Sequence, residues 1–77
     1  MADTFAEIYV RLLGEGIDAY RPVPAKYIDG FRFEVLKPVG YDPGVETWEF
    51  PPSSIVRCET RRLSEGNASV AIGFSEE

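Results

Sequence analysis

Apolar and polar residues alternate with a period of two along four segments of this chain. Such alternation puts apolar side chains on one face of a strand and polar side chains on the other, as in an antiparallel sheet with one buried face. The four segments together predict an all-β protein. The positions expected to face its core are Phe31, Phe33 and Val35, then Trp48 and Phe50, then Val56, Cys58 and Thr60, and finally Val70, Ile72 and Phe74.

Turn-forming residues separate these segments at intervals of about 8–15 residues, which is the spacing of short strands and not of long helices. No repeat or linker divides the 77 residues, so we expect a single domain over residues 1–77. The turn signals are GEG at 14–16, DG at 29–30, DPG at 42–44, PPSS at 51–54 and SEGN at 64–67.

The segment TFAEIYVRLLG, residues 4–14, fits both a helix and a strand. An apolar stripe at i, i+3, i+4 spacing favours the helix, and Thr4 and Glu7 would form its capping box. The alternation that contains Ile8 and Val10 favours the strand, as does the β-branched and aromatic content of the segment. The pattern alone leaves both alternatives open.

Two features of the next stretch of chain constrain how it enters a sheet. LLGEGID predicts a hairpin connection of about three residues with two glycines. Pro22 and Pro24 follow it, and a proline cannot donate a hydrogen bond to a neighbouring strand. We therefore expect the run IDAYRPVPAKYI to lie at a sheet edge or to be broken by a bend.

The stretch TWEFPPSS, residues 47–54, indicates a strand followed by a stop. Leaving Trp48 and Phe50 in water would be costly, so both are expected in the core, with Trp48 as an anchor. Pro51 lacks the N–H that would extend a strand pairing, and Pro52 presets φ for a turn. No P-x-x-P spacing occurs, so the stretch is not predicted to be a ligand of SH3 or WW modules.

Two groups of residues resemble the pattern of a family of small uncharacterised bacterial proteins. The resemblance covers residues 8–60 and implies a small SH3-like β-barrel of five to six antiparallel strands, with residues 4–14 as a strand and a short N-terminal helix as the alternative. It implies no catalytic residue. The chain departs from the pattern at Ser53 and Ser54, where a turn glycine is expected. The matching residues are Val10, Leu12, Glu15, Gly16, Arg21, Pro22 and Val23, followed by Trp48, Phe50, Pro52, Val56 and Cys58.

Charge and hydropathy exclude several classes of partner. Thirteen acidic and eight basic residues give a net charge of −5. Nucleic-acid-binding proteins gain affinity from basic patches, and the nearest approach to one here is Arg57, Arg61 and Arg62. We therefore do not expect a nucleic-acid partner. No apolar run reaches the roughly 18 residues of a membrane span, and the N-terminus lacks signal-peptide features, which predicts a cytoplasmic protein without membrane contact.

The residue content also excludes most catalytic arrangements. The chain has no histidine, which removes the commonest general base and zinc ligand. Cys58 is the single cysteine, and its place on an alternating strand predicts a buried thiol. Asp42, Glu46 and Glu49 lack the ligand spacing of a calcium loop. We expect a protein without catalytic activity, cofactor or metal.

The longest connection between predicted strands, PVGYDPGVE, is the expected binding surface. Tyr41 is its large aromatic residue and has no alternating partner with which to pair in a core. A tyrosine offers a large contact area for few torsions to freeze. Asp42 and Glu46 would select a basic partner and speed its approach.

These features favour a small non-catalytic protein-interaction module, for example an acidic adaptor or an inhibitor of a basic partner. Tyr9 and Tyr20, on the polar sides of their runs, are further candidates for partner binding. The alternative hypothesis is a single-stranded nucleic-acid-binding barrel, because FRFEV and YVRLL combine aromatic residues with arginine. Glu34 and the net charge oppose that alternative.

Overall fold

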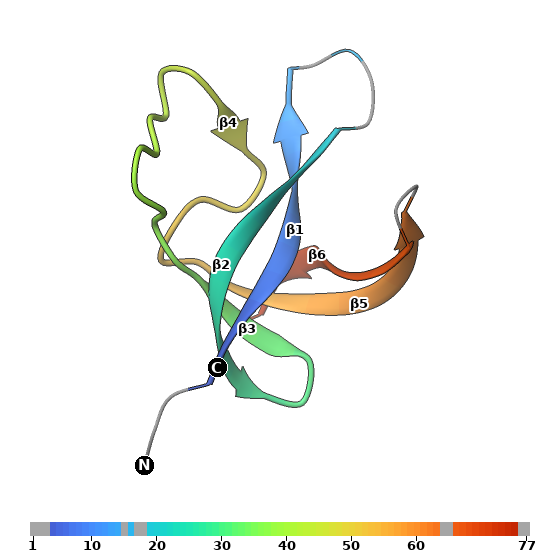
Figure 1. Cartoon of the computed structure of the whole chain (residues 1–77). Coiled ribbons are helices and arrows are strands. Elements are labelled where there is room, and N and C mark those ends of the chain that lie inside the picture. The colour runs from blue at the N-terminus through green and yellow to red at the C-terminus, as the bar shows by residue number, and fades with distance from the viewer. Residues whose placement is uncertain (1–3, 15, 17–18, 64–65, 76–77) are drawn as a thin grey trace.

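Six strands make up the regular structure of the described residues (Figure 1). The computed structural model describes residues 4–14, 16, 19–63 and 66–75. Across these ranges no helix occurs that could cross a membrane. The all-β prediction is confirmed, and the segment that the pattern left open is a strand. The strands are β1 (Phe5–Leu13), β2 (Tyr20–Asp29), β3 (Arg32–Val35), β4 (Thr47–Trp48), β5 (Ile55–Leu63) and β6 (Gly66–Phe74).

Hydrogen bonding between the strands closes into a ring, which gives the molecule a small barrel-like fold. Around the ring β1 pairs with β2, β2 with β3, β3 with β5, β5 with β6, and β6 again with β1. β4 lies outside the ring and pairs with the end of β1. The pairings are antiparallel, as predicted, except for the closing contact of β6 with β1, which is parallel and consists of the single pair Tyr9 and Val70.

The core fills the ring with small and medium-sized aliphatic side chains. Alternation along each strand turns these residues inward, and their burial is the main source of stability in a domain of this size. Trp48 and Phe50 extend the core and are 5% and 3% exposed, so the prediction that both are buried is confirmed. The largest fully buried side chains are Ile8, Val10, Val23, Val35, Val56 and Val70.

Phe31 contradicts the predicted alternation because it is 67% exposed. It precedes β3 and belongs to the turn from β2, where Gly30 adopts a left-handed backbone with φ +48°. Phe33 and Val35 lie on the strand itself and pack inward. The strand therefore begins at Arg32, and the alternation does not extend to Phe31.

The predicted inward set on β6 is also partly wrong. Arg57 pairs with Gly73 and Cys58 pairs with Ala71, so Ile72 is an extra residue in β6. Such a bulge shifts the side-chain alternation by one position. As a result Ala71 is buried beside Val70. Phe74 pairs with the buried Val56 and its ring meets the Phe50 ring edge-on, with centroids 4.9 Å apart, but the side chain is 63% exposed.

The prolines of β2 lie beyond its ladder with β3. Pro22 and Pro24 pair with β1, and pairing with β3 begins at Ala25. On the β3 side the Pro24 carbonyl accepts a hydrogen bond from Leu36 N at 3.0 Å, so Pro22 lies at the edge of the sheet as predicted. The β1–β2 connection is longer than the predicted three residues, since β1 ends at Leu13 and β2 begins at Tyr20. Residues 15, 17 and 18 of that predicted hairpin lie outside the described residues.

The stop after Trp48 is sharper than predicted, because β4 ends there and WEF is not a continuous strand. The chain turns through Pro51 and Pro52, and Ser54 N donates to Pro51 O at 3.2 Å. Ser53 has φ +78°, the one positive value at a non-glycine residue in the described part of the chain. A serine thus occupies the position for which such a turn favours glycine.

Candidate functional site

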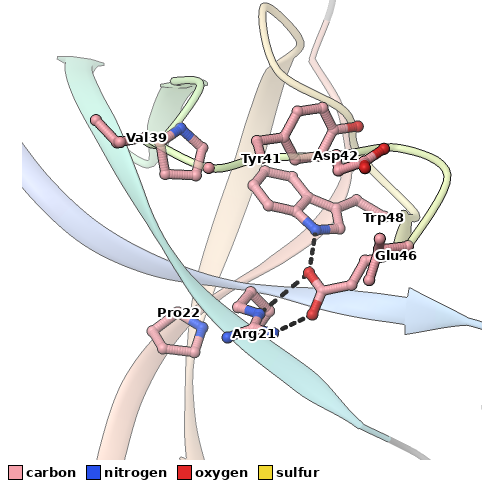
Figure 2. Close-up of a pocket in the computed structure, with 10 residues that line it drawn as sticks. Arg21, Pro22, Val39, Tyr41, Asp42, Glu46 and Trp48 are labelled. Atoms are coloured by element: carbon pink, nitrogen blue, oxygen red, sulfur yellow. Dashed lines mark hydrogen bonds and ion pairs between the residues drawn. The ribbon is translucent and has the colours of Figure 1, made fainter.

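The loop between β3 and β4, residues 36–46, folds back against β2 and encloses a pocket beside Trp48. The cavity volume is about 330 Å³. We call it the Trp48 pocket. Its walls are loop residues 38–42, 45 and 46, together with Arg21 and Pro22 of β2 and the Trp48 ring of β4 (Figure 2). Three of the five residues predicted to bind a partner therefore meet here, namely Tyr41, Asp42 and Glu46.

Glu46 ties the loop to the barrel through three polar contacts. Its Oε1 accepts a hydrogen bond from Trp48 Nε1 at 2.9 Å and another from Arg21 Nε at 3.2 Å. Its Oε2 forms an ion pair with Arg21 Nη2, so the guanidinium holds the carboxylate through both oxygens (Figure 2). The bidentate geometry is the favourable one for an arginine and a carboxylate.

These contacts hold Glu46 in its charged form. The hydrogen bond from Arg21 lowers the pKa of the Glu46 carboxyl, and the hydrogen bond from Trp48 lowers it further. Conversely, the hydrogen bond to Glu46 and its negative charge raise the pKa of Arg21. The buried indole N–H is satisfied by the same carboxylate, which allows Trp48 to serve both as core residue and as pocket wall.

Tyr41 differs from the sequence expectation, which gave it no partner in the core. Its ring lies edge-on to the ring of Trp48, with centroids 4.6 Å apart at an interplanar angle of 61° (Figure 2). The side chain is partly buried against the core. The backbone N–H of Tyr41 donates to Pro38 O at 3.2 Å, which forms the turn that carries the ring inward. Tyr41 is thus both structural and part of the pocket.

Asp42 shapes the loop through a local turn. Its Oδ1 accepts a hydrogen bond from the backbone N–H of Gly44 at 2.8 Å, and its carbonyl accepts from Val45 N at 3.0 Å. Side chains of this type commonly organise turns in this way. The turn leaves Val45 78% exposed on the rim, and Val39 on the preceding turn is fully exposed.

Tyr9 and Tyr20, the other two predicted binding residues, lie outside the Trp48 pocket. Tyr9 borders a shallow depression together with Glu7 and Thr60. Tyr20 borders another, in which Arg61 is a neighbour. Both tyrosines are partly buried. The structure therefore separates the five predicted residues into three regions.

Sequence reasoning missed four contributors to the pocket: Arg21, Val39, Val45, and Trp48 as a wall. Arg21 is 25 residues from Glu46 in the chain, and no local pattern connects them. The two valines could have been predicted as exposed apolar residues of a binding surface, because they lie within a turn-rich loop and do not belong to the alternating strands.

No group of three histidine, cysteine or acidic side chains that could hold a metal ion occurs in the parts of the chain that the structure describes.

Comparison with models of known protein families, with curated proteins and with solved structures gave no match. The resemblance to a family of SH3-like barrels therefore stays an expectation from the residues quoted for it.

Proposed function

We propose that this protein is a small non-catalytic interaction module whose Trp48 pocket binds a segment of another protein that carries a basic and an apolar side chain. The observation that supports the proposal most strongly is the convergence of Tyr41, Asp42 and Glu46 on one pocket with two exposed valines at its rim. Aromatic walls with a mixed polar and apolar rim are typical of protein-binding surfaces.

The rim supplies the apolar part of the interaction. Val39 and Val45 both project into solvent from turns of the β3–β4 loop. Covering a valine side chain with an apolar partner contributes about 1.5–3 kcal/mol when burial is complete. The loop is anchored by Glu46 on Arg21, so its rim is already ordered before a partner binds and little entropy is lost on association.

The acidic side chains supply the selectivity for a basic partner. Two carboxylates and one guanidinium line the pocket, which leaves it with net negative charge. Glu46 is neutralised by Arg21, whereas Asp42 has no ion-pair partner within the described residues. Asp42 is therefore the group that attracts a lysine or arginine of the partner.

The test is a selection of random heptapeptides displayed on phage against the immobilised full chain, followed by affinity measurements on the synthetic peptides. We expect selected peptides to combine a basic residue with an apolar one. Val39→Ser should weaken binding by about tenfold through lost burial. Asp42→Asn retains the oxygen that accepts from Gly44 and should weaken binding about two- to fivefold at low salt.

Glu7→Gln is the control for loss of a negative charge, because Glu7 is exposed on β1 away from the Trp48 pocket. It should leave the affinity unchanged. Failure to select any peptide that combines a basic residue with an apolar one, or selected peptides of this kind that bind wild-type protein and both pocket variants equally well, would refute the proposal.

A further inference from the structure

β5 is longer than the strand beside it. Its pairing with β3 ends at Arg57, and the last backbone contact on that side is the hydrogen bond from Cys58 N to Phe31 O at 2.8 Å. β5 nevertheless continues to Leu63, paired only with β6 (Figure 1). Among the described strands, residues 59–63 therefore have no neighbour on the β3 side. We call this segment the β5 open edge.

The direction of the backbone groups at this edge follows from the Cys58 hydrogen bond. In a strand, successive residues direct their N–H and C=O groups to alternate sides. Because the N–H of Cys58 faces β3, the N–H and C=O groups of Thr60 and Arg62 face the same, open side. An edge of this kind is a template on which an extended peptide can add a further strand.

β2 also has an edge, and its residues there differ from those of the β5 open edge. Beyond its pairing with β3, β2 contains Pro22 and Pro24, which lack the backbone donors that strand addition needs. The Pro24 carbonyl in addition accepts a hydrogen bond from Leu36 N at 3.0 Å. The β5 open edge contains no proline. It has charged side chains instead, which restrict the kind of strand that can pair there.

An exposed apolar side chain lies at the end of the β5 open edge that is nearest to the first residue of β3. Phe31 is 67% exposed, and with Cys58, Thr60 and Ile72 it borders a depression of about 420 Å³ alongside β5. A strand that continued the line of β3 past Phe31 would cover this ring. Covering it would recover part of the free energy lost by exposing a large aromatic side chain to water.

The charges along the edge select an acidic occupant. Arg57, Arg61 and Arg62 are exposed on β5, and Glu59 is the single acidic residue in that strand. Glu59 accepts a hydrogen bond from Arg61 Nε at 2.8 Å and is thereby neutralised. The edge is therefore locally positive on a chain of net charge −5. We propose that the β5 open edge binds an extended, acidic segment of another protein by strand addition, with Phe31 covering one end of it.

A single-stranded nucleic acid is the other polyanion to which the arginines could bind. One observation favours the peptide. Phe31 is the one aromatic side chain that borders the depression within the described residues. Binding of single strands relies on several stacked bases, for which one ring is a poor platform.

The test uses the full chain labelled with nitrogen-15 and a blocked pentapeptide of alternating glutamate and valine. A pentapeptide in extended form spans about 16 Å, which matches the length of the open edge. Three further kinds of probe are used. The first is the same peptide with lysine in place of glutamate, and the second is a pair of glutamate peptides, one N-methylated at the odd-numbered and the other at the even-numbered residues. The third is an oligothymidylate. The readout is amide hydrogen exchange at Thr60 and Arg62.

We expect the glutamate peptide to slow exchange at these two amides at least about fivefold at saturation, because both N–H groups become paired. The lysine peptide should leave exchange at Thr60 and Arg62 unchanged, and N-methylation of the residues whose N–H groups face β5 should abolish the effect of the glutamate peptide. Arg62→Glu should weaken the affinity for the glutamate peptide at least about threefold, a change within the range for an exposed charge pair. Lys37→Glu, the same change at an exposed residue of the β3–β4 loop, should not.

Several results would overturn the proposal. The first is unchanged exchange at Thr60 and Arg62 with the glutamate peptide at up to about 10 mM. The second is equal binding of the two N-methylated glutamate peptides. The third is binding of the oligothymidylate to the same residues with higher affinity than the glutamate peptide. Val39→Ser should leave the result unchanged, so this test is independent of the function proposed for the Trp48 pocket.

Discussion

Glu46 joins a loop, a β2 side chain and the indole of Trp48 at a single carboxylate. The carboxylate accepts from Arg21 and from Trp48 Nε1, so its charge is needed to hold the loop against the barrel. The local sequence indicated that Trp48 is buried and that Glu46 belongs to a functional loop. It did not indicate that the two bind each other, because the contact depends on how the loop closes.

This arrangement predicts a pH dependence of stability. The pKa of Glu46 is lowered in the folded state, so its stabilising contribution is fully present above the ordinary glutamate pKa of about 4.3 and is lost as pH falls through the folded value. Glu46→Gln keeps an acceptor for Trp48 Nε1 but removes the charge. The difference in unfolding free energy between wild type and Glu46→Gln should shrink between pH 6 and pH 3 in urea titrations. A difference that does not change with pH would contradict this role of the charge.

Ser53 carries a second prediction at the same scale. A left-handed backbone costs an L-residue about 1–2 kcal/mol, which glycine avoids, but the greater freedom of glycine in the unfolded chain offsets part of this gain. Ser53→Gly should therefore raise stability by about 0.5–1 kcal/mol, seen as an increase in Tm of several degrees. Ser54 does not have a positive φ, so Ser54→Gly should lower stability instead. Equal effects of the two substitutions would show that the Ser53 backbone is not strained.

Among the structural elements, the strands follow closely from the alternation of apolar and polar residues and from the turn-forming residues between the segments. Period-two patterning located β5 and most of β3, and the two prolines located the edge of β2. The errors came from non-local effects. The bulge at Ile72 depends on the pairing of β6 with β5, and the exposure of Phe31 depends on where the turn at Gly30 ends.

Phe31 and Phe33 provide a direct comparison of strand and turn positions. Equal burial was expected from the alternation, but Phe33 packs against the core and meets the Tyr27 ring edge-on at 5.5 Å, whereas Phe31 is exposed. Phe33→Ala should cost about 2–3 kcal/mol, somewhat less than for a fully buried phenylalanine. Phe31→Ala should change stability by less than about 0.5 kcal/mol. Chemical denaturation of both variants tests the assignment, and similar losses would contradict it.

At the scale of the whole molecule, the strand pairings close around a core that contains the one thiol of the chain. Ring closure could not be deduced from the residues alone, because it depends on the single parallel pair between β6 and β1. The pocket likewise forms only when the β3–β4 loop reaches β2. Three of its residues were predictable as loop residues with binding chemistry, and Arg21 was not.

Cys58 reports on the integrity of this closed core. Burial raises the pKa of its thiol to about 11, so the unfolded chain releases the thiol proton first as pH rises above the ordinary value of about 8.5. The free energy of unfolding should therefore fall with pH in that interval. Relative to Cys58→Ala, wild type should lose about 1–2 kcal/mol between pH 7 and pH 10 in urea titrations. Parallel pH profiles for the two proteins would show that the thiol is solvated.

The central claim is that the Trp48 pocket is a binding surface, and the indole N–H of Trp48 tests it most directly. The chain has one tryptophan, so its Nε1–H gives a single indole resonance, and this group donates to Glu46 within the pocket. Titration with a peptide from the heptapeptide selection should shift this resonance saturably in wild-type protein, with at least about tenfold weaker affinity in Val39→Ser. An indole resonance that does not move while other amides of the chain respond to the peptide would contradict the claim.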